Sequence, residues 1–149
     1  MNPTNSERRL ILCAQHARLR TTIETARTSA RNALSPRRSV GELQGAVMAL
    51  QRELLAHLAD EERLLEPILP QLDAWGSVRL DLLRAEHAYQ RGVLAVLTGH
   101  EAWPAGAVVA RRTLALCDDL LADMEFEERE LLNDKVLRDD FILLDASDC

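Results

Sequence analysis

Residues 43–68 read LQGAVMALQRELLAHLADEERLLEPI, and their apolar positions recur with a spacing of four, three, four and three residues. This spacing keeps every member on one face of a helix. The stripe consists of Leu43, Val47, Leu50, Leu54, His57, Glu61, Leu64 and Ile68. It therefore places an imidazole and a carboxylate, His57 and Glu61, among residues that should pack in a core. An isolated ionised carboxylate there is costly unless it is neutralised, paired or bound to a metal.

Three other segments show the same helical period and are separated by prolines and glycines. The first of them begins at Thr4, where Glu7 completes a capping box. The helix that contains the stripe through His57 and Glu61 begins at Ser39 with a similar glutamate, Glu42. We expect helices over residues 4–34, 39–66, 77–97 and 104–132. Four such helices with short connections predict an all-α fold, an antiparallel up-down-up-down four-helix bundle.

The predicted bundle accounts for residues 1–132, and we assign residues 133–149 to a short C-terminal tail. The tail shows no strong helical period, but it contains an apolar patch, Phe141-Ile142-Leu143-Leu144. We expect this patch to pack along the bundle. The alternative is that it serves a partner.

The composition argues against several classes of function. A chain of 149 residues is the size of one domain, and 47% hydrophobic residues suffice for a packed core. The net charge of −6 and an aromatic content of 3% argue against a nucleic-acid partner, which needs basic faces and stacking platforms. No apolar run approaches the ~18 residues of a membrane span, and the polar residues 1–9 lack a signal-peptide core. We therefore expect a cytoplasmic protein without a membrane partner.

Polar residues also interrupt the apolar stripes of the other three predicted helices. Histidines occupy stripe positions in the first and third, and two carboxylates lie one helical turn apart in the fourth. The inward-facing polar residues are His16, His57, Glu61, His87, Asp123 and Glu127. Three imidazoles and three carboxylates at one depth of a bundle would all be satisfied by a shared metal ion. Nitrogen and carboxylate ligands of this kind suit iron or manganese, with zinc as a further candidate.

Taken singly, each of these residues also has an ordinary structural explanation. His16 and His87 would be hydrogen-bonded core histidines, and Asp123 would belong to an acidic solvated face. The glutamates that follow the inward ones, Glu62 and Glu128, are assigned to the surface. The metal interpretation depends on the inward-facing residues occurring together rather than on any one of them.

Three short motifs resemble those of hemerythrin-like domains. Residues 57–62, HLADEE, resemble the His-x-x-x-Glu-Glu signature of that family, and residues 126–131, FEEREL, resemble its repeat on the last helix. Residues 85–87, AEH, resemble the motif of the third helix. The resemblance covers roughly residues 10–132. It implies a non-haem di-iron centre bridged by two carboxylates, in a protein that handles oxygen, nitric oxide, peroxide or iron itself.

Carried over residue by residue, the resemblance implies two iron positions. His16 and His57 would ligate one iron, and Glu61 and Glu127 would bridge it to the other. His87 would belong to the second iron.

Two positions depart from the family pattern, and both fall on ligands of the second iron. Arg91 stands where the family repeats a histidine four residues after His87, and Asp123 stands where it begins the last motif with histidine. We expect Arg91 to form a salt bridge with Asp123, because a guanidinium matches a carboxylate. This pairing would weaken or empty the second site and leave at most one well-held metal, near His16, His57 and Glu61.

Three functions follow as hypotheses. The first is a non-haem iron protein, with one or two metal ions, that binds or senses a diatomic ligand or peroxide and is not primarily an enzyme. The second is a carboxylate-rich di-iron oxidase or peroxidase. The third is a metal-free helical bundle that acts as an interaction module for a protein partner whose identity the sequence does not give.

Overall fold

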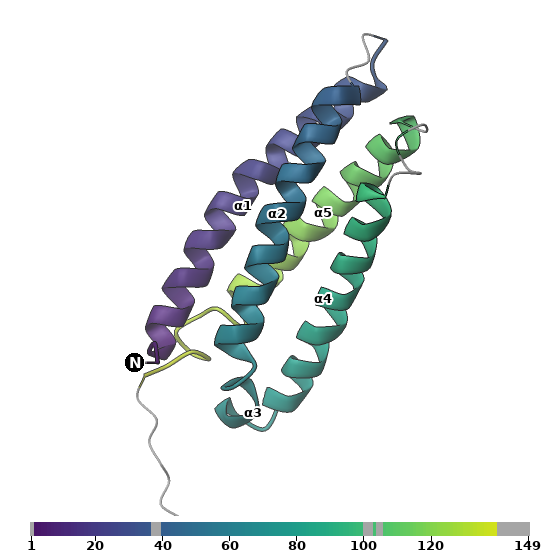
Figure 1. Cartoon of the computed structure of the whole chain (residues 1–149). Coiled ribbons are helices and arrows are strands. Elements are labelled where there is room, and N and C mark those ends of the chain that lie inside the picture. The colour runs from purple at the N-terminus through teal and green to yellow at the C-terminus, as the bar shows by residue number, and fades with distance from the viewer. Residues whose placement is uncertain (1, 37–39, 100–102, 104–105, 140–149) are drawn as a thin grey trace, which may run out of the picture.

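The computed structural model describes residues 2–36, 40–99, 103 and 106–139. The four long helices are α1 (Asn5–Leu34), α2 (Val40–Leu65), α4 (Gly76–Thr98) and α5 (Gly106–Glu130), and a short α3 (Leu69–Leu72) joins α2 to α4. Figure 1 shows the long helices side by side and alternating in direction along the chain. The predicted all-α four-helix bundle is therefore confirmed.

The helix boundaries follow the sequence signals closely at the N-terminal end. The side chain of Thr4 accepts a hydrogen bond from the Glu7 backbone N–H, and the Glu7 side chain accepts one from the Thr4 N–H. The predicted capping box is thus present, and α1 ends at Leu34 as expected. Ser39 and Pro104, the predicted starts of two other helices, lie outside the described residues.

A polar layer divides the apolar core of the bundle in two. The larger cluster is built from α1, α2, α4 and α5 on one side of the inward-facing histidines and glutamates. The smaller cluster, at the α3 end, consists of Leu12, Leu64, Leu65, Leu69, Leu83, Leu131, Leu132 and Leu137. On α1, for example, His16 lies between Leu12 of the smaller cluster and Leu19 of the larger one. Each long helix therefore crosses the polar layer once.

The first part of the predicted tail packs against the smaller cluster. Leu137 is 1% exposed, and the Asn5 side chain donates a hydrogen bond to the Arg138 carbonyl at 2.7 Å. The Ser6 backbone N–H donates to the Asp139 carboxylate at 3.0 Å. The apolar patch over residues 141–144 lies outside the described residues. In the described part of the chain, no helix is long and apolar enough to cross a membrane.

The turn at α3 depends on a close backbone approach at Gly76. A Cβ atom at this position would collide with the backbone carbonyl oxygen of Leu69. The Gly76 N–H also donates a hydrogen bond to the Asp73 carbonyl at 3.1 Å, which closes the turn into α4. Only glycine allows the start of α4 to lie this close to α3.

We predict that Gly76→Ala destabilises the protein by about 1–3 kcal/mol, because the added methyl group must displace backbone. The matched control is Gly45→Ala within α2, where nothing lies within 4 Å of the added Cβ atom. That change should stabilise the protein by about 1 kcal/mol through helix propensity. Urea denaturation of both variants tests the prediction, and an unchanged midpoint for Gly76→Ala would contradict it.

Candidate metal centre

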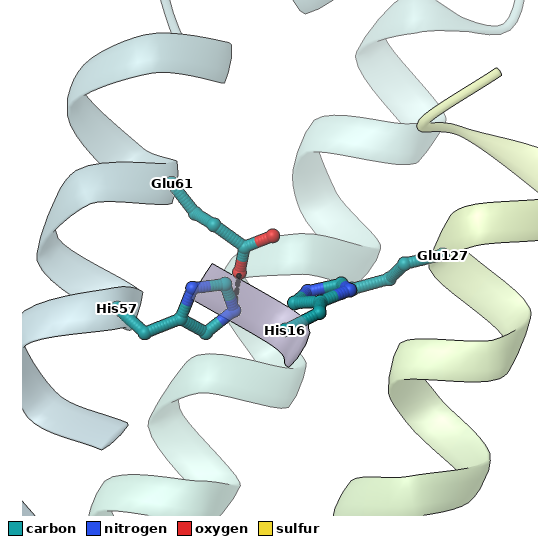
Figure 2. A group of neighbouring side chains, drawn as sticks. All are labelled: His16, His57, Glu61 and Glu127. Carbon is teal, nitrogen blue, oxygen red and sulfur yellow. Dashed lines mark ion pairs between the residues drawn. The ribbon is translucent and has the colours of Figure 1, made fainter. Parts of the chain in front are cut away.

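Four buried side chains from three helices converge inside the bundle (Figure 2). They are His16 from α1, His57 and Glu61 from α2, and Glu127 from α5. Each offers one nitrogen or carboxylate oxygen, and these atoms all lie within 4.8 Å of one another. The two imidazole rings meet edge to face, with their centroids 4.8 Å apart. The four residues are hereafter called the His/Glu group.

The other two residues predicted for the site lie at the border of this group. His87 on α4 is 1% exposed, and its Nε2 lies 3.1 Å from Oε2 of Glu61. Asp123 on α5 is half-buried and accepts a hydrogen bond from Nε2 of Gln90 at 2.7 Å. Asp123 and Gln90 line a cavity of about 10 Å³ together with His57, Glu61, Glu127, Leu19, Leu54, Leu58, Leu120 and Met124.

Each of the three inward-facing histidines contacts, through Nδ1, a polar side chain on the outer side of the centre. The contacts are His16 with Glu128, His57 with Gln15, and His87 with Glu62, each at 2.9 Å. A carboxylate can only accept a hydrogen bond. Nδ1 of His16, which faces Glu128, therefore carries a proton, and so does Nδ1 of His87, which faces Glu62. Each Nε2 is then left facing an interior carboxylate. This arrangement is typical of metal-ligating histidines, whose other nitrogen donates to an outer acceptor.

The amide of Gln15 fixes His57 in the same way. Its Nε2 donates to the Asp60 carboxylate at 2.7 Å, which leaves its carbonyl oxygen facing Nδ1 of His57. Because that oxygen can only accept, Nδ1 of His57 carries a proton as well.

Burial sets the ionisation of the acidic side chains in the centre. It raises the pKa of Asp123 to about 7, and the nearby charge of Glu127 adds to this effect. It also raises the pKa of Glu127, and the charge of Glu61 acts in the same direction. By contrast, the Arg91 guanidinium holds the pKa of Glu62 at about 2. Asp123 and Glu127 therefore bind a proton more tightly than a free carboxyl group does, and Glu62 binds one less tightly.

The three histidines respond differently to the same burial. Burial lowers the pKa of His57 to about 4, and the neighbouring His16 adds to the effect. Burial also acts to lower the pKa of His16 and of His87, but the adjacent carboxylates more than offset it, so both values rise. Without a metal ion, His16 and His87 thus supply the positive charge that the interior carboxylates require.

Two atoms of the His/Glu group have no hydrogen-bond partner in the described part of the chain, and these atoms are the ones that a bound cation would satisfy. Nε2 of His16 and Oε1 of Glu61 are buried and have no hydrogen-bond partner among the described residues. Nε2 of His16 lies 3.3 Å from Oε2 of Glu127, but not in hydrogen-bond geometry. Buried polar atoms of proteins are nearly always satisfied. A cation between these nitrogen and oxygen atoms would satisfy both.

A family model described as the hemerythrin HHE cation binding domain matches residues 11–136. The chain belongs to this family. The match spans all four long helices and the entire His/Glu group. The comparisons with curated proteins and with solved structures gave no match.

Within this hemerythrin-like domain, the predicted Arg91–Asp123 salt bridge is wrong. Arg91 instead pairs with Glu62, its Nη1 and Nη2 donating to the two carboxylate oxygens at 2.6 and 3.0 Å. Glu62 satisfies the planar guanidinium with both oxygens. The amide of Gln90, one residue before Arg91, donates to Asp123.

The assignment of Glu62 and Glu128 to the surface also needs correction. Their side chains are 31% and 32% exposed, and each accepts a hydrogen bond from a buried histidine. A helix turns by about 100° per residue, so the neighbour of an inward glutamate lies at the edge of the stripe and faces the adjacent helix. The sequence signal was the doubled glutamate itself, which occurs at residues 61–62 and again at 127–128.

The raised pKa of Asp123 predicts a pH-dependent stability of the metal-free domain. Because this pKa is 3.8 in the unfolded reference and about 7 in the fold, the folded state binds the proton more tightly. Stability carried by this group therefore falls as the pH rises from about 4 to about 7. We expect Asp123→Asn, which keeps an acceptor for Gln90, to stabilise the metal-free protein more at pH ~8 than at pH ~5.

Urea denaturation at the two pH values measures this difference. Asp81→Asn, at an exposed carboxylate on α4, is the matched control for the loss of one carboxylate. An equal effect of Asp123→Asn at both pH values would show that burial does not govern its ionisation.

Proposed function

We propose that this protein is a hemerythrin-like non-haem iron protein that binds or senses a small ligand. The ligands of the metal are His16, His57, Glu61 and Glu127. The observation that carries the proposal is the convergence of four buried side chains whose donor atoms lie within 4.8 Å of one another. Two of these side chains, His16 and Glu61, each have a buried polar atom without a hydrogen-bond partner among the described residues. Oxygen, nitric oxide and peroxide are the proposed ligands, and iron itself is the proposed cargo if the site stores or senses metal.

The donor set supports iron over softer metals. Two imidazoles with carboxylates and open coordination positions are typical of non-haem ferrous sites. The group offers no thiolate that would favour a structural zinc site. Manganese and zinc bind the same donors and are the alternatives that metal analysis must distinguish.

The cavity beside the His/Glu group supports a small ligand. Its volume of about 10 Å³ corresponds to a single water-sized occupant, which is too little for an organic substrate. Its polar lining consists of His57, Glu61, Gln90, Asp123 and Glu127, and leucines and Met124 form the apolar remainder. A ligand of about the size of one water molecule therefore fits next to the proposed metal ligands Glu61 and Glu127.

We predict that wild-type protein purified without chelators contains about stoichiometric iron and that His57→Ala and Glu61→Gln lose most of it. The two residues lie one helical turn apart and both contribute to the group. His100→Ala is the matched control, because this histidine lies outside the predicted metal pattern. Elemental analysis of the three variants measures the effect. Equal iron in all of them, or a metal-free wild type, would overturn the proposal, and the latter would favour a metal-free interaction bundle.

Metal loading should also stabilise the fold. At a free metal concentration of 100 times Kd, linkage adds about 2.7 kcal/mol to the free energy of unfolding. We expect this gain in the wild type and in His100→Ala but not in His57→Ala. A thermal melt with and without added ferrous iron under anaerobic conditions gives the comparison.

A second candidate function is oxidation of ferrous iron or reduction of peroxide, and the position of Asp123 favours it. This carboxylate joins Glu61 and Glu127 around the cavity, which makes the surroundings rich in oxygen donors. Addition of peroxide to the ferrous protein in the presence of excess ferrous iron, which supplies the electrons for each reduction of peroxide, separates the two functions. Repeated turnover that Asp123→Asn slows would identify an enzyme, whereas a single stoichiometric reaction would identify a binding protein.

A further inference from the structure

His16 and His87 each belong to an outer set of hydrogen bonds, and the two sets involve the same types of residue and the same atoms. Each histidine is followed four residues later by an arginine, Arg20 on α1 and Arg91 on α4. In both cases the arginine and the histidine hold the same glutamate on a neighbouring helix. The two units are hereafter called the arginine clamps.

In the first clamp, Oε1 of Glu128 accepts from Nδ1 of His16 and from Nη1 of Arg20, both at 2.9 Å. Oε2 of Glu128 accepts from Nη2 of Arg20 at 3.0 Å. The clamp therefore joins α1 to α5.

In the second clamp, Oε1 of Glu62 accepts from Nδ1 of His87 at 2.9 Å and from Nη1 of Arg91 at 2.6 Å. Oε2 of Glu62 accepts from Nη2 of Arg91 at 3.0 Å. This clamp joins α4 to α2. The arginine side chains of the two clamps are 38% and 39% exposed, so even their depth in the bundle agrees.

We propose that Arg20 and Arg91 are positioning residues of the metal centre, each acting through its glutamate to hold one histidine with Nε2 aimed at the interior. The inference rests on the proposed function. It assigns a role to Arg91, the residue that stands in place of a family histidine: it does not bind metal but aligns His87.

The chemistry of the clamp explains why an arginine is needed. A glutamate alone, one third exposed and on a flexible stem, would accept from histidine in many orientations. A guanidinium binds both carboxylate oxygens in one plane and fixes the carboxylate. The fixed carboxylate then holds the proton on Nδ1 and increases the donor strength of Nε2 toward a cation.

The chain also contains an arginine–glutamate pair that lacks the histidine. Arg84 on α4 donates to both oxygens of Glu66, which directly follows α2, at 2.9 and 3.2 Å. It joins the same two regions as the second clamp, but the structure shows no histidine hydrogen-bonded to Glu66 among the described residues. Arg84 is therefore the matched control for a purely structural contribution.

The first measurement uses the metal-free protein, so it does not depend on metal binding. In protein labelled with ¹⁵N-histidine, the Nδ1–H groups of His16 and His87 should exchange slowly with water and give separate NMR signals. We expect Arg91→Met to remove or broaden the His87 signal, Arg20→Met to affect that of His16, and Arg84→Met to affect neither.

The second measurement is titration of each variant with Co²⁺ as a spectroscopic probe. Loss of an outer partner of a metal-ligating histidine typically costs 10–100-fold in metal affinity, and we expect about this increase in Kd for Arg20→Met. For Arg91→Met we expect a smaller increase, because His87 acts on the metal through the ligand Glu61, whose Oε2 lies 3.1 Å from Nε2 of His87. Arg91→Lys, which keeps the charge without the planar fork, should give an intermediate Kd. If circular dichroism shows that Arg91→Met does not fold, Arg91→Lys is used in its place.

The outcomes separate the proposals. If Arg91→Met and Arg91→Lys behave like Arg84→Met in both measurements, Arg91 is not a positioning residue. If the His87 signal changes but Co²⁺ affinity does not, the clamp holds the histidine without serving a metal, and the inference is overturned. If the wild type binds no Co²⁺, the proposed function fails, while the NMR signals still show whether the clamps exist.

Discussion

The structure is organised around the cost of placing carboxylates and imidazoles in the core of a helical bundle. Glu61 and His16 are almost fully buried, and neither could remain there without compensation. The four long helices each place at least one polar residue in the same layer, so that the charges and hydrogen bonds compensate one another. A conventional apolar core then fills the bundle on both sides of that layer.

Compensation proceeds outward in steps. The interior groups contact one another, their outer nitrogens donate to Glu128, Gln15 and Glu62, and two of these acceptors are held by arginines at the surface. The arginine cations thus lie where water still solvates them, whereas the charges of His16 and His87 are buried and are matched by carboxylates. This arrangement explains how one domain keeps carboxylates and imidazoles inside while leaving donor atoms directed at a common point.

The sequence predicted the fold well because helix periodicity and capping depend on residues within one segment. The capping box at Thr4 and the stripe through His57 and Glu61 needed no knowledge of other helices. The partners of Arg91 and Glu62 could not be found in this way. The spacing of residues indicates which face of a helix each one occupies. Which residues at the edges of the apolar stripes meet depends on how each helix is rotated relative to its neighbour. Arg91 and Asp123 were assigned to each other because the family pattern places both at the second iron and because their charges are opposite. In the structure, Glu62 on α2 pairs with the guanidinium instead, and Gln90 donates to Asp123.

The division of the core has a consequence for the dynamics of the domain. The two apolar ends are separate packing units, and the polar layer between them contributes little hydrophobic contact. Native-state hydrogen exchange commonly divides proteins into such cooperative units, each with its own opening free energy. The smaller unit includes Leu137, so we expect it to open when the segment after α5 detaches from the start of α1. A cation bound in the polar layer would link α1, α2 and α5 between the two apolar clusters. The two clusters would then open in a single cooperative step.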